Sequence, residues 1–140
     1  IPLRLVGSEM CIRDSSISLK GINGKDLQIL IAEDNDSNYS LVKHILKEYQ
    51  ITRVVNGVEA VEKVRDEEFD IVLMDMKMPI MGGLEATRKI RELNPIIPII
   101  ALTANAFDAD RVSAMEAGCN AFLTKPLKKE ELLELFSFKL

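Results

Sequence analysis

The stretch Ile71-Val-Leu-Met-Asp-Met-Lys-Met-Pro79 decides the fold of this chain. Its first four residues are all apolar, which is typical of a strand that is buried on both faces of a sheet, and Asp75 follows directly. Residues Met76–Gly83 contain a proline and two adjacent glycines and therefore predict a loop. A helical pattern follows over Leu84–Leu93 and ends at Asn94-Pro95. A buried strand that leads through a loop into a helix is the repeating unit of a parallel sheet.

The same unit recurs on both sides of this stretch. Strands are predicted over Leu27–Ala32, Ile51–Val55, Pro98–Leu102 and Ala121–Thr124. The matching helices run from a cap at Asp36 or Ser37 to about Tyr49, from the Asn56-Gly57 turn to about Asp66, over Asp108–Ala117, and from Lys128 to about Phe136. Strands that alternate with helices predict an α/β fold, a doubly wound parallel sheet with helices on both faces.

Composition and charge narrow the class of protein. The chain has 140 residues, 47% of them hydrophobic and 29% charged, which fits one globular domain. Its net charge is −4 and it has no basic cluster, so we expect no direct contact with nucleic acid. No apolar run reaches the length of a bilayer span, so we expect no direct membrane contact. Cys11 and Cys119 have no metal-binding spacing and form no disulfide framework.

The N-terminal residues 1–15 do not resemble the rest of the chain. They show neither a helical nor a strand period. Met10–Asp14 can be encoded by ATG TGT ATA AGA GAC, which matches a transposon end used in some sequencing-library preparations. We therefore interpret residues 1–15 as an adapter-derived or disordered segment, 16–24 as a linker, and 25–138 as the folded domain. Since Ile1 is not a methionine, we also expect the reading frame to begin upstream, within a longer protein.

Polar residues stand at the carboxyl ends of four predicted strands: Glu33-Asp34, Asp75, Thr103 and Lys125. These ends meet at one edge of a parallel sheet, where ligands bind in open α/β folds. Three carboxylates close together repel one another, and a divalent cation such as Mg²⁺ relieves that repulsion. Three acids, one lysine and one hydroxyl form an environment suited to a transferred phosphoryl group.

Five stretches together resemble the response-regulator receiver family of two-component signalling: Ile29–Asn35, Asn56–Ala60, Ile71–Pro79, Ile99–Ala104 and Ala121–Pro126. The resemblance extends from Leu27 to about Phe136 and is greatest to the C-terminal receiver of a hybrid histidine kinase; a free single-domain regulator is the second possibility. It implies a flavodoxin-like (βα)5 sheet with strand order 2-1-3-4-5.

The resemblance also implies roles for individual residues. Asp75 is expected to be the phosphoacceptor and a metal ligand. Asp34 is expected to bind the metal directly, Glu33 to bind it through a water, and Lys77 to contribute its backbone carbonyl. Thr103 and Lys125 are expected to contact phosphoryl oxygens, with the small Ala104 leaving access to them. Phe122 is expected to act with Thr103 as a switch, although it could equally be only a core aromatic, and the Lys125-Pro126 peptide is expected to be cis.

The function implied is a phosphorelay switch that depends on Mg²⁺ (or Mn²⁺) and takes its phosphoryl group from a histidine kinase or a histidine phosphotransfer protein. Such a domain assists its own phosphorylation and dephosphorylation and is not an enzyme for a separate substrate; a histidine kinase is the candidate parent protein. We expect a cytoplasmic location, free or as part of a membrane-bound hybrid kinase, and a monomer or a phosphorylation-dependent dimer. The conformational change that follows phosphorylation is expected at the face formed by the fourth helix, the fifth strand and the fifth helix.

Two other functions compete with this one. A pseudo-receiver would bind proteins without being phosphorylated, and the intact set of acids, threonine and lysine argues against it. An aspartate-nucleophile phosphatase carries a second aspartate two residues after the nucleophile, where this chain has Lys77. Gly82 stands where the receiver family often has aspartate, and the short connection Tyr49-Gln-Ile51 leaves the register of the second strand open.

Overall fold

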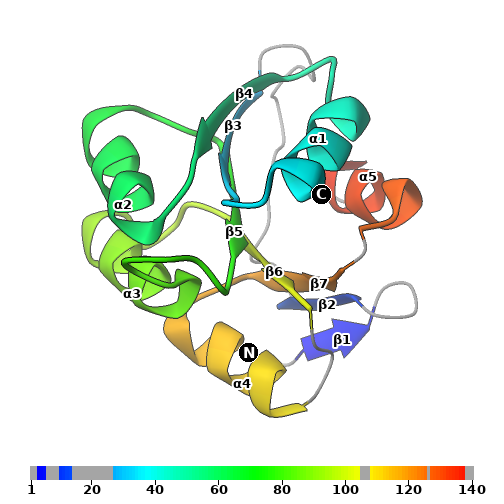
Figure 1. Cartoon of the computed structure of the whole chain (residues 1–140). Coiled ribbons are helices and arrows are strands. Elements are labelled where there is room, and N and C mark those ends of the chain that lie inside the picture. The colour runs from blue at the N-terminus through cyan, green and yellow to red at the C-terminus, as the bar shows by residue number, and fades with distance from the viewer. Residues whose placement is uncertain (1–2, 6–9, 14–26, 105–107, 126, 138–140) are drawn as a thin grey trace.

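A computed structural model of the chain describes residues 3–5, 10–13, 27–104, 108–125 and 127–137. Its centre is a parallel sheet of β3 (Gln28–Ala32), β4 (Gln50–Val54), β5 (Ile71–Asp75), β6 (Ile99–Thr103) and β7 (Ala121–Thr124). The order across the sheet is β4-β3-β5-β6-β7 (Figure 1). Numbered along the repeat, this is the predicted order 2-1-3-4-5, so the predicted fold class is confirmed.

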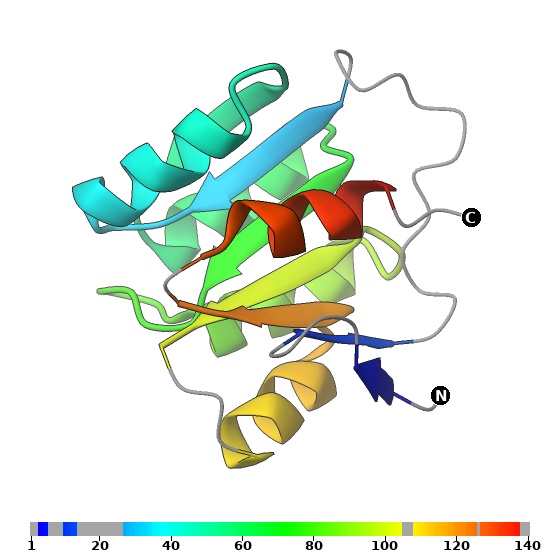
Figure 2. The same cartoon turned by 90° about the vertical axis from the view of Figure 1, so that its right-hand side faces the viewer.

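Helices cover both faces of this sheet. They are α1 (Asp36–Ile45), α2 (Gly57–Asp66), α3 (Gly83–Leu93), α4 (Asp108–Ala117) and α5 (Lys129–Ser137). Helices α1 and α5 lie on one face, and α2, α3 and α4 lie on the other (Figures 1 and 2). None of the helices in the described part of the chain has the length and apolarity needed to cross a bilayer.

Alternation along the strands divides the core into two layers. In β3, Ile29 and Ile31 join the buried cluster beneath α1 and α5, whereas Leu30 and Ala32 join the cluster beneath α2, α3 and α4. Both sets are fully buried because each face of the sheet is covered. This explains why the central strands are continuously apolar and why each polar residue at a strand end marks the rim of the sheet.

Helix α1 departs from the prediction at both ends. Its cap is Asn35, not Asp36 or Ser37: the Asn35 side-chain oxygen accepts a hydrogen bond from the Asn38 N–H at 2.9 Å. The helix ends at Ile45 instead of about Tyr49. A turn follows, in which the Tyr49 N–H donates to the Leu46 carbonyl at 3.0 Å, so the chain can enter β4 already at Gln50. The sequence left the register of this strand open; in the structure β4 pairs with β3 so that Arg53 lies opposite Ile31.

Two short strands also occur in the N-terminal segment, where the sequence shows no strand pattern. Strands β1 (Leu3–Leu5) and β2 (Met10–Arg13) pair antiparallel, and β2 pairs antiparallel with β7, so the two strands extend the sheet beyond β7. Both strands lie in the segment that the sequence analysis interprets as adapter-derived or disordered. The origin of the segment and the domain boundaries stay predictions, and the predicted linker 16–24 lies outside the described residues.

Candidate functional site

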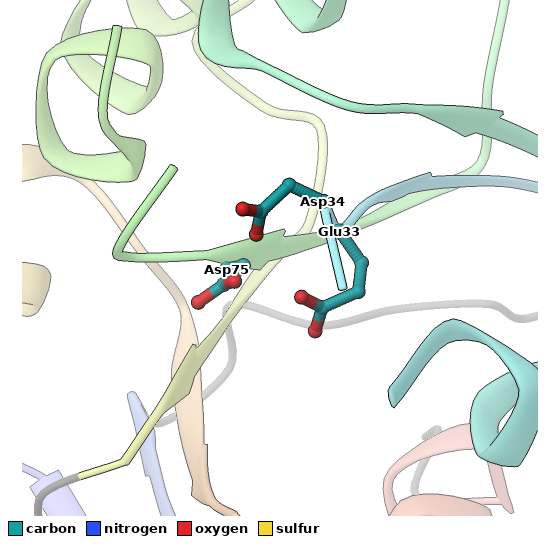
Figure 3. A group of neighbouring side chains, drawn as sticks. All are labelled: Glu33, Asp34 and Asp75. Atoms are coloured by element: carbon teal, nitrogen blue, oxygen red, sulfur yellow. The ribbon is translucent and has the colours of Figure 1, made fainter. Parts of the chain in front are cut away.

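Three carboxylates gather where β3 and β5 end. Glu33 and Asp34 directly follow β3, and Asp75 is the last residue of β5. One oxygen from each lies within 4.8 Å of the others. Figure 3 shows how the three side chains are arranged around the strand ends. Glu33 and Asp75 are buried, whereas Asp34 is exposed, so the cluster is open to solvent on the Asp34 side. The predicted meeting of these acids at one rim is therefore observed.

Lys125 places a positive charge between two of these acids. Its ammonium nitrogen lies 2.9 Å from Glu33 Oε1 and 3.2 Å from Asp75 Oδ2. The Glu33 side chain is 0% exposed, and this ion pair accounts for the charge on its otherwise unbonded Oε1. One lysine offsets one of three carboxylates, so the cluster keeps an excess of negative charge that favours a further cation.

Asp75 titrates above the ordinary range of an aspartate. Burial, followed by a hydrogen bond with Glu33 and repulsion from its charge, raises the pKa of Asp75 to about 6. The Lys77 backbone N–H, which donates to Asp75 Oδ1 at 3.2 Å, and the Lys125 charge both act to lower that pKa. The carboxylate of Asp75 is thus ionised at neutral pH but stays close to its titration range.

Two glycines, whose role the sequence reasoning missed, let the loop after β5 pack tightly. A Cβ atom on Gly83 would collide with the Asp75 carbonyl oxygen, so α3 can begin directly against the end of β5 only with glycine there. A Cβ atom on Gly57 would likewise collide with the Met81 carbonyl, to which the Gly57 N–H donates at 2.9 Å. The paired glycines of the predicted loop and the Asn-Gly turn were the available signals.

The remaining predicted residues are placed as follows. Thr103 ends β6, is 8% exposed, and its carbonyl accepts a hydrogen bond from the Lys125 N–H at 2.7 Å. Ala104 follows and is exposed, as is Lys77. Phe122 is buried within β7, on the face covered by α2, α3 and α4. Pro126, and with it the predicted cis peptide, lies outside the described residues.

The donor set fits a hard divalent cation. Mg²⁺ prefers oxygen ligands and is often held by one or two carboxylates together with water and a phosphate. Here two carboxylates are fixed by burial and the third, on Asp34, is accessible. A lysine and a buried threonine stand at the neighbouring strand ends.

The fold and this rim define a class of protein: a doubly wound domain built to hold a cation and a phosphoryl group beside a buried aspartate. Residues 29–137 match the family described as the response regulator receiver domain, and the chain belongs to that family. It is a receiver domain of two-component signalling, of the kind found in sensor kinases.

Three similar proteins are informative. The autoinducer 2 sensor kinase/phosphatase LuxQ of Vibrio vulnificus is 41% identical over 83% of this chain, but the match spans 14% of that protein's length. The receiver domain of sensor histidine kinase PA1611 of Pseudomonas aeruginosa has magnesium coordinated in its active site cleft. It is 38% identical, with a TM-score of 0.75, and the match covers 80% of this chain and 95% of that one. A third match is the co-crystal structure of the Saccharomyces cerevisiae histidine phosphotransfer protein Ypd1 with the receiver domain of its response regulator Ssk1. The match has 28% identity and a TM-score of 0.74, and it covers 79% of this chain and 86% of that one.

Proposed function

We propose that Asp75 is the phosphoacceptor of this receiver domain and takes its phosphoryl group from a phosphohistidine. The observation that carries the proposal is the position of Asp75: it is buried at the end of β5, 3.2 Å from the Lys125 ammonium, and its carboxylate shares a cluster with Glu33 and Asp34. A carboxylate in this environment has a cation to orient it and acids to hold a metal beside it.

The chemical step is a transfer between two nucleophiles. A carboxylate oxygen of Asp75 attacks phosphorus, the new P–O bond forms as the P–N bond to the imidazole breaks, and the released imidazole nitrogen takes a proton from solvent. No oxidation or reduction occurs. The domain itself supplies position and charge: Lys125 and the Thr103 hydroxyl would contact phosphoryl oxygens, and the small Ala104 would leave room for them.

The same cluster would hold Mg²⁺, or Mn²⁺, through Asp34, Asp75 and the Lys77 carbonyl, with Glu33 acting through a water. When bound, the ion would neutralise charge on the transferred phosphoryl group. The magnesium in the similar receiver of PA1611 supports this assignment. The pseudo-receiver alternative is less well supported, because every member of the acid, threonine and lysine set is present and brought to one rim.

We further propose that residues 25–138 form the receiver part of a hybrid histidine kinase, following the match to a small part of the LuxQ sensor kinase. The complex of a similar receiver with a histidine phosphotransfer protein supports such a protein, or a kinase, as the partner. The cytoplasmic location, the monomer or phosphorylation-dependent dimer, and the switch role of Thr103 and Phe122 at the α4-β7-α5 face are parts of the same proposal.

The proposal is tested by intact mass after incubation with a small phosphodonor. The unchanged chain should gain one phosphoryl group with Mg²⁺ and none after chelation, and Asp75→Asn should gain none. Asp66→Asn is the matched control, because Asp66 is an exposed carboxylate paired with Arg65 outside the cluster. Uptake that persists in Asp75→Asn would refute the assignment of the nucleophile, and no uptake with any donor would favour the pseudo-receiver.

A further inference from the structure

Arg53 links the edge strand β4 to the loop that carries Asp34. Its Nε donates a hydrogen bond to the carbonyl oxygen of Glu33 at 3.1 Å, and one of its terminal nitrogens lies 2.9 Å from Asp36 Oδ1. Glu33 directly precedes Asp34, and Asp36 follows it by two residues. One side chain therefore holds the chain on both sides of Asp34, a member of the carboxylate cluster.

The guanidinium of Arg53 is itself held in place. Its central carbon lies 4.4 Å from the centroid of the Tyr39 ring, a cation–π arrangement that orients the plane of the group. The Arg53 side chain is 24% exposed, so its hydrogen bond to the Glu33 carbonyl is partly shielded from water, whereas Asp36 is 91% exposed and its ion pair with Arg53 lies in solvent. A planar fork of donors that reaches two acceptors and stacks on a ring is available to arginine and not to lysine.

Other hydrogen bonds fix the residues on either side of Asp34. The Glu33 N–H donates to the Val54 carbonyl at 3.0 Å, and the Asn35 N–H donates to Glu33 Oε2 at 3.3 Å. Asp34 is exposed and follows the carbonyl that Arg53 holds. The direction of its Cα–Cβ bond, and with it the reach of its carboxylate toward Glu33 and Asp75, depends on how that carbonyl is fixed.

We propose that Arg53 is a positioning residue for the divalent cation at this rim; the proposal rests on the proposed function of the site. Arg53 does not touch the ion. It fixes the Glu33 carbonyl and Asp36, and thereby holds the carboxylate of Asp34 where it can share an ion with Asp75.

The charge of Arg53 and its contacts with the loop should have opposite effects on the affinity for Mg²⁺, so the two effects can be separated by experiment. A positive charge near the cluster repels a cation, so through charge alone Arg53 would weaken Mg²⁺ binding. Through position, Arg53 strengthens binding. Arg53→Lys keeps the charge but loses the fork, and Tyr39→Leu changes no charge but removes the ring that orients the guanidinium. Both substitutions therefore isolate the positional effect.

The experiment is calorimetric titration of the whole unphosphorylated chain with Mg²⁺ at fixed ionic strength. We expect a Kd weakened by about tenfold in Arg53→Lys, the lower end for residues that orient metal ligands. In Tyr39→Leu we expect the Kd for Mg²⁺ to be weakened about threefold, as for loss of a partly exposed cation–π contact. Arg65→Lys is the matched control, because Arg65 pairs with Asp66 on α2 away from the cluster, and its Kd should not change.

A second readout is the Mg²⁺ dependence of phosphorylation by a small phosphodonor. In Arg53→Lys the concentration for half-maximal rate should rise about tenfold, in step with the weakened Kd, while the rate at saturating Mg²⁺ stays that of the unchanged chain. A Kd unchanged in both Arg53→Lys and Tyr39→Leu would overturn the proposal. If Arg53→Lys fails to fold, as judged by circular dichroism, Tyr39→Leu decides.

The two proposals can fail separately. If the unchanged chain binds Mg²⁺ but takes up no phosphoryl group, the phosphoacceptor function fails and the Kd comparison still tests Arg53. If the unchanged chain binds no Mg²⁺, the proposed metal site and the positioning role of Arg53 both fail.

Discussion

Asp75 combines two properties that conflict at the scale of a single residue. It must be ionised to act as a nucleophile, yet burial and the neighbouring Glu33 favour its neutral form and raise its pKa to about 6. Because its ordinary pKa is 3.8, the folded state holds this proton more tightly than the unfolded chain does. The stabilisation linked to that proton is complete below about pH 4 and is lost as pH rises through about 6.

We therefore predict that, without Mg²⁺, the unchanged chain loses stability relative to Asp75→Asn between pH 4 and pH 6.5. The expected difference is roughly 1 to 3 kcal/mol in the free energy of unfolding. Urea denaturation at several pH values measures it. Parallel pH profiles for the two proteins would show that the pKa of Asp75 is not raised in the folded state.

Ile80, in the loop that follows β5, has a strained backbone conformation. Its φ is 70°, its side chain is 82% exposed, and the Met81 N–H donates to the Pro79 carbonyl across it at 2.7 Å. A β-branched residue is rarely found in this left-handed region, where asparagine is tolerated much better. Almost none of its apolar surface is buried in return.

Ile80→Asn should therefore raise the free energy of unfolding by about 1 kcal/mol. Ile96→Asn is the control, because Ile96 is 81% exposed but has no positive φ, and it should change stability by less than about 0.5 kcal/mol. Chemical denaturation of both variants provides the measurement. Equal effects of the two substitutions would contradict the assignment of strain to Ile80.

At the scale of elements, the site depends on how closely α3 approaches the end of β5. Gly83 is the point of contact, because its Cα faces the Asp75 carbonyl with no space for a side chain. At Gly82, one residue earlier, a Cβ atom would meet only the Met76 carbonyl oxygen at 3.3 Å, which is tight but can be relieved by a small shift.

Gly83→Ala should destabilise the domain by roughly 1 to 3 kcal/mol, as overpacking does, and should also weaken Mg²⁺ binding because it displaces the end of β5. Gly82→Ala should cost less than about 1 kcal/mol and leave the Kd for Mg²⁺ unchanged. Thermal unfolding and calorimetric titration measure both effects. A Gly83→Ala protein that binds Mg²⁺ normally would show that the close approach does not determine the geometry of the site.

The sequence predicted elements best where burial decides them. The apolar runs of β5 and β7 and the pattern of α4 end where the structure ends them, with Asp75 closing β5 as predicted. The end of α1 and the start of β4 were misplaced because the intervening turn rests on backbone hydrogen bonds, which leave little mark on side-chain type. Asn35 was passed over as the cap because Asp36 and Ser37 are equally good capping residues.

At the scale of the whole molecule, strand order is what assembles the site. Glu33, Asp75 and Lys125 stand at the carboxyl ends of β3, β5 and β7, far apart in the chain, and they converge because parallel strands share one carboxyl edge. That convergence followed from the predicted topology. The roles of Arg53 and Gly83 did not, because an arginine on an edge strand and a glycine in a loop have many ordinary explanations in a sequence alone.

Since the cluster exists only in the folded chain, Mg²⁺ should stabilise the whole domain. At a hundredfold excess over its Kd, the free energy of unfolding should rise by about 2.7 kcal/mol. Asp34→Asn should lose most of this gain, whereas Asp66→Asn should keep it. Thermal unfolding with Mg²⁺ or with NaCl at equal ionic strength measures the difference. Equal stabilisation by NaCl would mean that the cluster is not a metal site.

The most direct test of the phosphoacceptor role is to identify the residue that carries the phosphoryl group. After incubation with a phosphodonor and Mg²⁺, borohydride reduces an aspartyl phosphate to homoserine, and peptide mass spectrometry then locates the altered position. We predict homoserine at position 75 alone, dependent on the phosphodonor and on Mg²⁺. Homoserine at another aspartate, or a phosphoryl group that survives borohydride on a hydroxyl or imidazole side chain, would contradict the assignment of Asp75 as the phosphoacceptor.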